Sequence, residues 1–516
     1  MKRKLYIELL FLISIGALTT LSLPPFNYFL INFFTFPLFF TFLYKKFDHQ
    51  RNLKLFFIYG WVFGFGYFST NLYWVSISLT FDQNFKFLIP ISLILIPAYL
   101  SVFYGLVSSL FIIIRPKNII SSFLVFSLIF GIFEFIRGSI LTGFPWNLIS
   151  YSLSNQLELL SITSIVGTYG FNLFCISLFT SPAILIFRKK KLDIGVFVIF
   201  FILLVLSYIY GSQQKEKFNK IVKEELDYKI RIVASNISLA RFYSGIDSIS
   251  IIKDLILISE PEPQKKTIFI WPEGILPEIS QKELVEYNWL FNKDFNKNHL
   301  LIIGINSEKE INGLKSYYNT FSLYDNKINL IHSYEKINLV PFGEFLPFEK
   351  ILSNIGLKSL TNNYRSFSSG HHRNIIEIDQ NNFSLKILPL ICYEIIYSGK
   401  LFNNPEFDLI INISEDGWFG KSIGPEQHFT HSIFRAIESG KYVIRSSNNG
   451  TSAVVNPLGQ VEQRVDYGKS GYIDFEENRK IQPTIFSKYG NKIFGLLILL
   501  YIFLVFSFNK FRNEQS

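Results

Sequence analysis

Residues 388–397 read LPLICYEIIY, an apolar run that ends at Cys392 and is followed two residues later by Glu394. A short run rich in Leu and Ile is typical of a buried β-strand. The thiol therefore stands at the end of a predicted strand, close to a carboxylate. The chain has one other cysteine, Cys175, in its 516 residues. What such a thiol can do depends first on which side of a membrane it lies.

The composition indicates a membrane protein. Hydrophobic residues make up 49% of the chain and charged residues only 17%, which is too apolar for an ordinary soluble protein. Long apolar stretches recur, each close to the roughly 20 residues that a helix needs to cross a bilayer. We predict eight transmembrane helices, at residues 5–23, 28–44, 55–80, 87–114, 118–137, 160–187, 194–210 and 491–508.

These spans predict the domain organisation. Residues 1–210 form a seven-helix transmembrane domain, residues 228–482 form a domain outside the membrane, and residues 491–508 form the last helix. The first span resembles a secretory signal peptide, but its apolar run is long and no clear small-x-small cleavage site follows. We therefore expect the first span to be retained as a membrane helix.

The basic residues predict the orientation of the spans. Lys and Arg residues, 15 in total, precede the first span and follow the second, fourth, sixth and eighth, whereas the short loops on the other side hold little besides Lys86. The positive-inside rule then places both termini in the cytoplasm and the domain that follows residue 211 outside. This asymmetry accounts for the net charge of +10, so the charge gives no support for nucleic-acid binding.

Some predicted spans contain polar residues that lipid would not tolerate. Glu134 and Arg137 are three residues apart on one helical face, so we expect them to pair with each other or to face a protected cavity. Their role is either to fix helix packing or to serve a site. Two stretches, 63–75 (FGFGYFSTNLYWV) and 142–152 (TGFPWNLISYS), place Gly, Asn, Trp and Tyr near the outer interface. They indicate either an aromatic belt with small-residue packing or a polar floor for a lipid headgroup.

The outer domain alternates between predicted strands and helices, which indicates a layered α/β fold. Segments 281–295 and 425–440 are predicted helices. Segment 351–374 is polar and rich in Ser and Asn, so we interpret it as a long loop and a candidate mobile lid. The predicted strands are short, apolar and rich in Ile, Val and Phe; they are 229–237, 266–271, 299–305, 319–325, 327–334, 383–392, 407–414, 441–447 and 451–457.

The position of Cys392 suggests a chemical use. Cys175 lies within the sixth predicted span, so Cys392 is the only cysteine of a domain exported to an oxidising compartment and has no partner for an internal disulfide. Such a thiol either has a chemical use or is buried as a small hydrophobic side chain.

A catalytic thiol needs a base and a positive charge. Glu273 follows one predicted strand, in IFIWPEGILPE, and Lys336 follows another, in HSYEKINLVPFGEFLPF, with Glu344 eight residues further on. Polar residues just beyond strand ends are where open α/β sheets assemble their sites. A carboxylate can accept the thiol proton, since only the thiolate attacks well, and a lysine can stabilise an oxyanion. Glu273 or Lys336 alone is more often a surface charge. Together with Cys392, the two residues predict an active site.

These motifs resemble a known family. WPEG, YEKINLVPFGEF and ICYE are similar to the Glu–Lys–Cys signature of the nitrilase, or carbon–nitrogen hydrolase, superfamily. The resemblance implies that the outer domain is an αββα sandwich. With seven predicted spans before this domain and one after it, the whole chain resembles the apolipoprotein N-acyltransferase family, and the membrane motifs PPFN, GYFSTNLYW and GFPWN fit that family as well.

The resemblance implies a role for each matching residue. Glu273 would be the general base, Lys336 would support the tetrahedral intermediate, and Cys392 would be the nucleophile. The implied supporting residues are an auxiliary carboxylate, two neighbours of the nucleophile and an aromatic residue in a mobile loop that borders the site: Glu344, Tyr393, Glu394 and Trp418.

One position departs from the family pattern. The family tends to place a tryptophan shortly after the first strand, where this chain has Phe242 and Tyr243. An aromatic residue is retained there, but no site role is assigned to it.

The resemblance also implies a reaction. Cys392 would take an acyl chain from a membrane phospholipid as a thioester and pass it to the α-amine of a diacylglyceryl-cysteine at the N-terminus of a lipoprotein. We expect no cofactor and no metal, a monomer, and a location in the bacterial inner membrane with the catalytic domain in the periplasm. The alternatives are a membrane-anchored amidase that uses water and a non-catalytic receptor or transporter.

The histidines of the outer domain give no metal site. His428 and His431 are three residues apart on a predicted helix, but zinc normally needs a third ligand of suitable type. We interpret them as polar residues of a helix face, and we assign no role to His371 and His372.

Overall fold

The computed structural model describes residues 2–49, 51–243, 246–311, 313–354, 366–380, 383–402 and 405–513. The chain divides into two compact units. The helical unit comprises Met1–Glu216, Ser422–Thr430 and Thr484–Ser516, and the α/β unit comprises Lys217–Lys421 and His431–Pro483.

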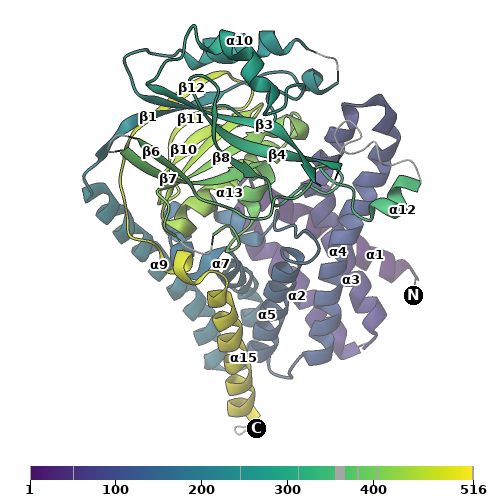
Figure 1. Ribbon diagram of the computed structural model, residues 1–516. Helices are drawn as coiled ribbons and strands as arrows, with labels where there is room; N and C mark the ends of the chain where they lie inside the picture. The colour runs from purple at the N-terminus through teal and green to yellow at the C-terminus, as the bar shows by residue number, and fades with distance from the viewer. Residues whose placement is uncertain are drawn as a thin grey trace. The chain divides into compact units, whose positions relative to one another are not determined.

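The helical unit consists mainly of long apolar helices (Figure 1). Their residues are mostly Phe, Leu and Ile, and a helix satisfies every interior backbone hydrogen bond within the segment, as a bilayer requires. Side chains also cap the helices: Asn118 accepts a hydrogen bond from the N–H of Ser121 at 3.0 Å. The long helices are α1 (Lys2–Thr19), α2 (Asn32–His49), α3 (Leu53–Leu72), α4 (Ile89–Ile114), α5 (Ile119–Arg137), α7 (Thr163–Thr180), α9 (Lys191–Lys220) and α15 (Lys492–Asn513).

Within the described residues, six segments are long and apolar enough to cross a membrane: Arg3–Ser22, Gln83–Ile114, Ile119–Arg137, Thr163–Ile186, Lys191–Lys220 and Lys492–Lys510. The sequence predicts eight. The other two predicted segments, α2 and α3, do form helices but are not among these six. The last turns of α2 carry Lys45, Lys46 and Asp48, and α3 contains three Gly, two Tyr and one Trp.

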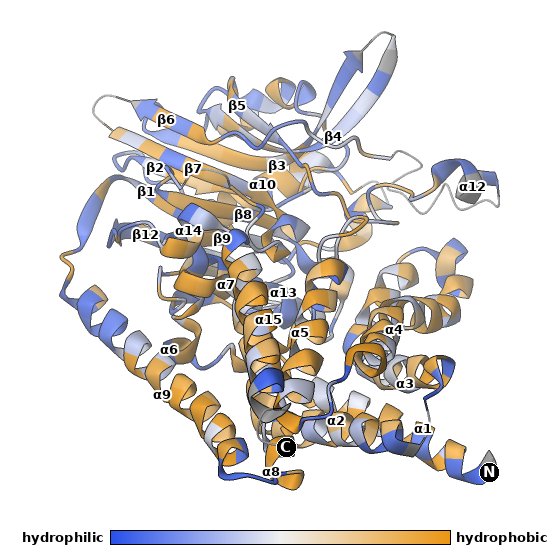
Figure 2. Cartoon of the chain, turned by 90° about the horizontal axis from the view of Figure 1, so that it is seen from below, coloured by the Kyte–Doolittle hydropathy of each residue, from blue (hydrophilic) through white to orange (hydrophobic). Residues whose placement is uncertain are grey.

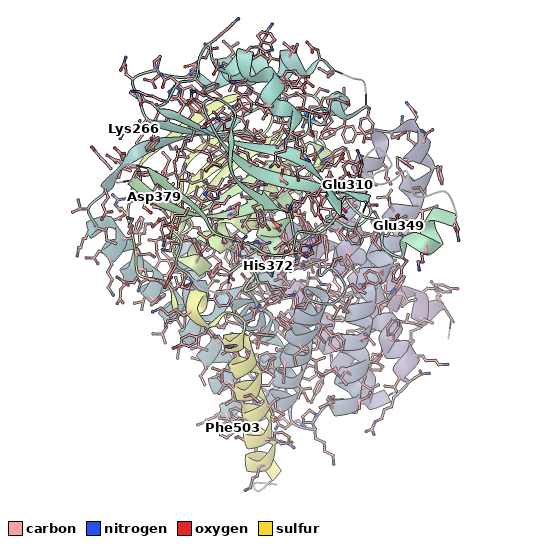
Figure 3. All side chains as sticks on the ribbon, in the orientation of Figure 1. Lys266, Glu310, Glu349, His372, Asp379 and Phe503 are labelled. Atoms are coloured by element: carbon pink, nitrogen blue, oxygen red, sulfur yellow. The ribbon has the colours of Figure 1, made fainter. Side chains whose placement is uncertain are left out.

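The outer faces of the helices carry apolar side chains. Phe503 projects from α15 and is 65% exposed (Figure 3). The α9 and α15 helices are hydrophobic along most of their length (Figure 2). A large exposed apolar surface is unfavourable in water and favourable in lipid. The helical unit therefore has the surface of a membrane protein.

Two predicted details of the helical unit are confirmed. Arg137 and Glu134 form an ion pair, with Nη2 at 2.5 Å from Oε2, and both side chains are fully buried. Arg137 also donates a hydrogen bond to the carbonyl oxygen of Phe144. Cys175 is buried in α7.

The α/β unit contains two six-stranded sheets, with strand orders β12-β1-β2-β3-β4-β5 and β11-β10-β9-β8-β7-β6. In each sheet three neighbouring strands are parallel: β1, β2 and β3 in the first, and β7, β8 and β9 in the second. The strands are β1 (Glu224–Ala234), β2 (Thr267–Ile270), β3 (His299–Ile311), β4 (Leu314–Asp325), β5 (Leu330–Glu335), β6 (Ile376–Gln380), β7 (Phe383–Ile391), β8 (Leu409–Glu415), β9 (Tyr442–Asn448), β10 (Ser452–Val455), β11 (Val461–Val465) and β12 (Gly471–Asn478).

The nine predicted strands are present, as β1 to β5 and β7 to β10. The sequence does not predict β6, β11 or β12. All three are edge strands of their sheets, and β11, for example, is largely solvent-exposed. Because a strand needs little apolar surface at such a position, its sequence carries a weak strand signal.

Helices cover the sheets. A hydrophobic core joins the first sheet to α10 (Ser248–Ser259) and α11 (Asn288–Phe291), with Phe269, Trp271 and Leu301 among its buried members. The α10 helix was not predicted. The predicted helix 281–295 is mostly a 3₁₀ turn followed by the short α11.

The second predicted helix, 425–440, is confirmed as α13 (Gly424–Ser439). The predicted loop 351–374 begins with helix α12 (Glu349–Asn354), so its first residues are helical. Residues 355–365, the centre of the candidate lid, lie outside the described residues.

Gln427, in the first turns of α13, belongs to the helical unit and joins three of the membrane motifs there. Its Oε1 accepts hydrogen bonds from the indole N–H groups of Trp146 at 2.9 Å and Trp74 at 3.3 Å. Its Nε2 donates to Oδ1 of Asn71 at 3.2 Å and to the carbonyl oxygen of Pro24 at 3.3 Å. Because both indoles are buried and hydrogen-bonded, the aromatic-belt interpretation is wrong for these two tryptophans.

Candidate active site

The three residues that the sequence predicts to form a site follow three strands of the α/β unit. Glu273 lies three residues beyond β2, Lys336 directly follows β5, and Cys392 directly follows β7. All three are buried. Glu273 and Lys336 are in direct contact at 3.0 Å, and both lie near enough to Cys392 for their charges to affect the pKa of its thiol.

Lys336 lies between two carboxylates. Its Nζ is 3.0 Å from Oε1 of Glu273 and 2.9 Å from Oε1 of Glu344. The side-chain amide of Asn319, in β4, donates to the same two oxygens at 2.7 Å and 2.9 Å. One ammonium and one amide thus hold the two carboxylates together, and Glu344 lies next to Glu273 and Lys336, as the resemblance implies.

The second oxygen of each carboxylate is fixed by a backbone N–H group. Oε2 of Glu273 accepts from the N–H of Glu415 at 2.9 Å, at the end of β8. Oε2 of Glu344 accepts from the N–H of Val340 at 2.8 Å. Because every carboxylate oxygen has a donor, Glu273 presents a defined orientation to its neighbours.

The protonated form of Lys336 is stabilised by its neighbours. Burial alone would lower the pKa of this lysine, but the carboxylates of Glu273 and Glu344 and the thiol of Cys392 raise the pKa well above its ordinary value. Lys336 therefore stays protonated at neutral pH and provides a fixed positive charge beside the thiol.

Cys392 occupies an unusual backbone conformation. Its φ of 47° lies in the left-handed region, at the junction between β7 and a 3₁₀ turn formed by Cys392–Ile396. A residue with a side chain rarely adopts this conformation unless its surroundings hold it. Burial and the negative charge of Glu273 raise the pKa of the thiol well above its ordinary value, whereas Lys336 and a hydrogen bond with the side chain of Ser414 oppose this rise. The resting thiol is therefore neutral, and its reaction needs a base.

Glu394 forms hydrogen bonds with the backbone after Lys336 and with the backbone before Cys392. Its Oε1 accepts from the N–H groups of Ile337 at 3.0 Å and Asn338 at 3.2 Å, directly after Lys336. Its Oε2 accepts from the N–H of Ile391 at 2.9 Å, directly before Cys392. One buried carboxylate thus holds the backbone on both sides of the site.

Two further side chains contact Glu394. Tyr334 donates to Oε1 at 2.7 Å, and Arg373 Nη2 lies 2.5 Å from the same oxygen. Arg373 also donates to the hydroxyl oxygen of Tyr334 at 3.1 Å and to Oδ1 of Asn338 at 3.1 Å. The negative charge of Glu394 is therefore paired with the positive charge of Arg373, and the carboxylate is held in place.

Aromatic residues lie near the strand ends. Trp418 belongs to the 3₁₀ turn Asp416–Phe419 that follows β8. Its ring centroid is 5.1 Å from that of Phe242 and 6.4 Å from that of Tyr243, the two residues at which the chain departs from the family pattern. Tyr393 is buried next to Cys392 and packs edge-on against Tyr397 at 5.6 Å.

A second group of polar residues behind Cys392 was not predicted. Glu415 is the last residue of β8 and Asp416 directly follows it, so the strand-end rule that selected Glu273 could have found them. Nothing in the sequence singles out Asn319, because it lies within a strand. The other residues that sequence reasoning missed are Arg241, which pairs with Glu415, and Arg373, Asn412, Ser414 and Arg445.

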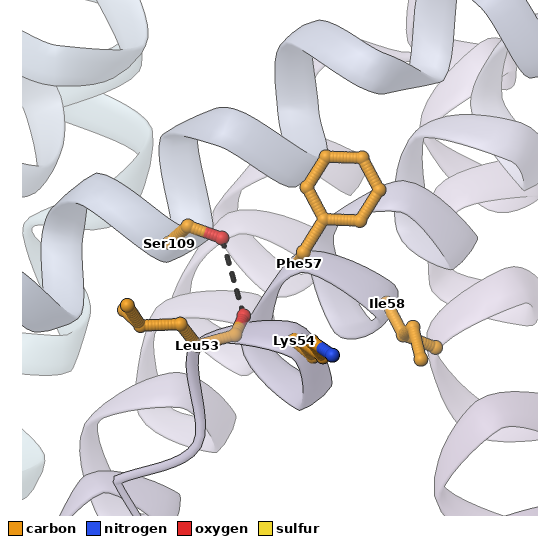
Figure 4. Close-up of a pocket in the computed structure, with 5 residues that line it drawn as sticks. All are labelled: Leu53, Lys54, Phe57, Ile58 and Ser109. Atoms are coloured by element: carbon orange, nitrogen blue, oxygen red, sulfur yellow. Dashed lines mark hydrogen bonds between the residues drawn. The ribbon is translucent and has the colours of Figure 1, made fainter.

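A pocket of the helical unit and the two histidines of α13 are less suited to nucleophilic catalysis. A surface pocket of the helical unit is lined by Leu53, Lys54, Phe57, Ile58 and Ser109 (Figure 4), a set with neither a carboxylate nor a thiol. His428 and His431 are buried rather than solvent-facing, and the His428 ring stacks on Trp146 with centroids 5.2 Å apart.

Comparison with known proteins gives two family matches. Residues 15–180 match the apolipoprotein N-acyltransferase N-terminal domain, and residues 256–479 match the carbon–nitrogen hydrolase family. The second match confirms for the α/β unit the nitrilase-superfamily fold that the motifs predict. An amidase of that superfamily from Nesterenkonia superposes with a TM-score of 0.34 at 12% identity, over 50% of this chain and 92% of that one.

Curated relatives match nearly the full length. The chain is 31% identical over 513 residues to an apolipoprotein N-acyltransferase from Rhodopseudomonas palustris, covering 95% of this chain and 93% of that protein. It is 33% identical over 485 residues to one from Rickettsia prowazekii, covering 92% and 94%. It is 29% identical over 475 residues to one from Brucella melitensis, covering 89% and 87%.

Proposed function

The chain belongs to the apolipoprotein N-acyltransferase family, and on this basis we propose that it transfers an acyl chain from a membrane phospholipid to the N-terminal diacylglyceryl-cysteine of lipoproteins. The observation that carries this proposal is the contact of one buried lysine with two carboxylates beside a buried thiol. This arrangement supplies a base, a positive charge and a nucleophile, which are the parts of a covalent acyl-transfer site.

In the first step, Glu273 takes the proton from the Cys392 thiol, and the sulfur attacks the ester carbonyl carbon of the phospholipid. The Nζ of Lys336 stabilises the oxyanion of the tetrahedral intermediate. The carbon–oxygen bond to the lysophospholipid then breaks, and the leaving oxygen takes the proton back from Glu273. Cys392 is left as a thioester.

In the second step, the α-amine of the diacylglyceryl-cysteine attacks the thioester carbonyl carbon. Glu273 accepts a proton from the amine, the carbon–sulfur bond breaks, and the sulfur of Cys392 recovers that proton. The product is an amide, and the enzyme returns to its starting state. Two successive displacements predict ping-pong kinetics.

The neighbouring residues have supporting roles. Glu344 and Asn319 fix the positions of the Lys336 and Glu273 side chains relative to each other. Glu394 fixes the backbone beside Lys336 and Cys392. Tyr393 packs next to the nucleophile, and Trp418 borders the site together with Phe242. Glu344, Tyr393, Glu394 and Trp418 are in this proposal positioning residues.

The membrane region fits lipid substrates. We propose eight transmembrane helices, α1, α2, α3, α4, α5, α7, α9 and α15, with both termini in the cytoplasm, residues 228–482 in the periplasm, and a monomer as the functional form. A cysteine introduced by Lys86→Cys, in a chain with Cys175→Ala and Cys392→Ala, should react with a membrane-impermeant maleimide in spheroplasts. Lys190→Cys should react only after permeabilisation, and the reverse pattern would overturn this topology.

Intact-mass spectrometry of the full chain in phospholipid tests the reaction. The protein should gain the mass of one acyl group, C392A should gain none, and C175A, a matched control, should behave like the parent. Addition of a diacylglyceryl lipopeptide should discharge the adduct and yield an N-acylated peptide. An acyl adduct on C392A would contradict the proposal.

The same experiment separates the alternatives. An amidase of the superfamily would release its acyl group to water, so a free acid would form and the lipopeptide would stay unmodified. A receptor or transporter would form no adduct and would bind lipid equally well in C392A.

A further inference from the structure

Four polar side chains behind Cys392 have no part in the proposed reaction. Asn412 and Ser414 lie on β8, Asp416 follows that strand, and Arg445 lies opposite Asn412 on β9. None of the four is exposed. Burying an arginine and an aspartate is costly even when they are paired, so this group calls for an explanation.

Arg445 organises the group. Its Nη2 donates to both oxygens of Asp416, at 2.9 Å and 2.8 Å, and its Nε donates to the carbonyl oxygen of Thr451 at 3.2 Å. Its Nη1 donates to Oδ1 of Asn412. The guanidinium group therefore holds Asn412, on the adjacent strand, and Asp416, just beyond the end of that strand.

Asn412 forms a hydrogen bond with Cys392 directly, and Asp416 is connected to Cys392 through Ser414. Ser414 donates its hydroxyl proton to Oδ1 of Asp416 at 2.7 Å. Because β7 and β8 are parallel and Ile391 pairs with Ile413, the next residues, Cys392 and Ser414, are neighbours, and the Ser414 side chain forms a hydrogen bond with the thiol. On the other side, Nδ2 of Asn412 donates to the carbonyl oxygen of Cys392 at 3.4 Å. One branch reaches the sulfur and the other reaches the backbone of the same residue, whose left-handed φ needs such support.

The serine hydroxyl has a single proton. While it donates that proton to Asp416, Ser414 can only accept a hydrogen bond from the thiol. A thiolate has no proton and can only accept. The bond between Ser414 and sulfur can therefore survive deprotonation only if the hydroxyl turns from Asp416 to the sulfur. Asp416 can release it, because two hydrogen bonds from Arg445 remain.

We propose that Ser414 is a two-state hydrogen-bond partner of Cys392, which accepts from the thiol and donates to the thiolate, and that Asp416 and Arg445 position it. When Glu273 takes the thiol proton, the Ser414 O–H bond rotates from the Asp416 oxygen to Sγ, and no further proton is gained or lost. The charged groups that act on the sulfur are Glu273, Lys336 and Asp416. Ser414 thus complements Lys336 in stabilising the thiolate. This inference rests on the proposed role of Cys392 as nucleophile.

Alkylation of Cys392 by iodoacetamide tests the inference without requiring acyl transfer. In the full chain with Cys175→Ala, the rate is measured from pH 6 to pH 10 by peptide mass spectrometry. Hydrogen bonds to charged groups correspond to about ten- to a hundredfold in an equilibrium, so S414A should slow alkylation at pH 8 by about tenfold or more. S414T, which keeps the hydroxyl, should restore most of the rate.

A matched control is S432A, because the Ser432 hydroxyl is equally buried and has no hydrogen-bond partner among the residues that the structure describes. It should leave the alkylation rate unchanged. A merely structural role of Ser414 would loosen the site, expose the thiol and speed alkylation, so the direction of the change is decisive. An unchanged or faster rate in S414A would overturn the inference. If wild-type protein forms no acyl adduct on Cys392, that result would instead count against the proposed function. The alkylation test would still apply, because it does not depend on acyl transfer.

Discussion

Lys336 Nζ lies 3.0 Å from Oε1 of Glu273, and the side chains of both residues are more than nine-tenths buried. The two residues are separated by 63 positions in the chain and follow different strands. A positive charge this deeply buried is stable only next to negative charge. The pair therefore serves the fold as well as the proposed chemistry, and its removal should affect both.

Substitution of Lys336 by Met should leave Glu273 and Glu344 buried without their cation. Breaking a buried ion pair costs about 3–5 kcal/mol, so K336M should lower the thermal unfolding temperature and abolish the acyl adduct. Unfolding in detergent and intact mass measure the two effects. The control is K315A, since Lys315 forms an exposed pair with Glu308 that is worth at most about 1 kcal/mol. A K336M protein that still forms the adduct would exclude the proposed role of this lysine.

Substitution of Glu394 by Gln should slow acyl transfer, because the fully buried Glu394 is in this proposal a positioning residue. Glutamine replaces one acceptor oxygen with a donor, which would face backbone N–H groups of Ile337 and Asn338 or of Ile391. Losing a hydrogen bond to a charged group costs about 1.5–3 kcal/mol. We expect a fall in kcat of at least about tenfold. The matched control is E377Q on β6, whose side chain is half exposed, and equal activity of both variants would refute the positioning role.

The pH dependence of Cys392 reactivity follows from its burial. Burial raises the pKa of this thiol well above its ordinary value, and only the thiolate is alkylated. In the absence of substrate the alkylation rate should therefore increase about tenfold per pH unit from pH 7 to pH 9 without a plateau. A cysteine introduced by Lys315→Cys, at an exposed position, should show the midpoint of its rate increase near pH 8.5 and level off about one pH unit higher. A plateau of Cys392 reactivity below pH 8 would contradict this assignment.

Substitution of Gln427 by Ala should destabilise the helical unit. The change leaves two indole N–H groups, the Asn71 side chain and the carbonyl oxygen of Pro24 without their partner. Each unsatisfied buried group costs about 1–3 kcal/mol, so thermal unfolding followed by tryptophan fluorescence should occur at a clearly lower temperature.

Q427E provides a graded comparison, because it keeps the acceptor for the indoles but loses the amide donor, and it should fall between Q427A and wild type. The control is Q156A, since Gln156 belongs to the same unit and is exposed. If Q427A and Q156A unfold at the same temperature, the hydrogen bonds of Gln427 contribute nothing measurable.

Much of the fold was predictable because its signals are local. Apolar runs marked the helices that cover the first 210 residues, and short Ile- and Val-rich runs marked β1 to β5 and β7 to β10. The strands that escaped prediction, β6, β11 and β12, lie where little apolar surface is needed. Segment 281–295 has a helical pattern but folds mainly as a 3₁₀ turn with one short helix, since tertiary packing overrides a weak local preference.

The sequence by itself determined which residues stand at strand ends, among them Glu273, Lys336 and Cys392, because hydrophobic periodicity and the residues that interrupt it are properties of neighbouring positions. Only the tertiary structure decided which polar groups meet. Asn319 with Glu273, Arg445 with Asp416, and Gln427 with Trp146, 281 residues away, are pairs that no local pattern encodes. Their partners are selected by strand order and helix packing, and burial then makes each pairing necessary, because an unpaired polar group away from water is costly.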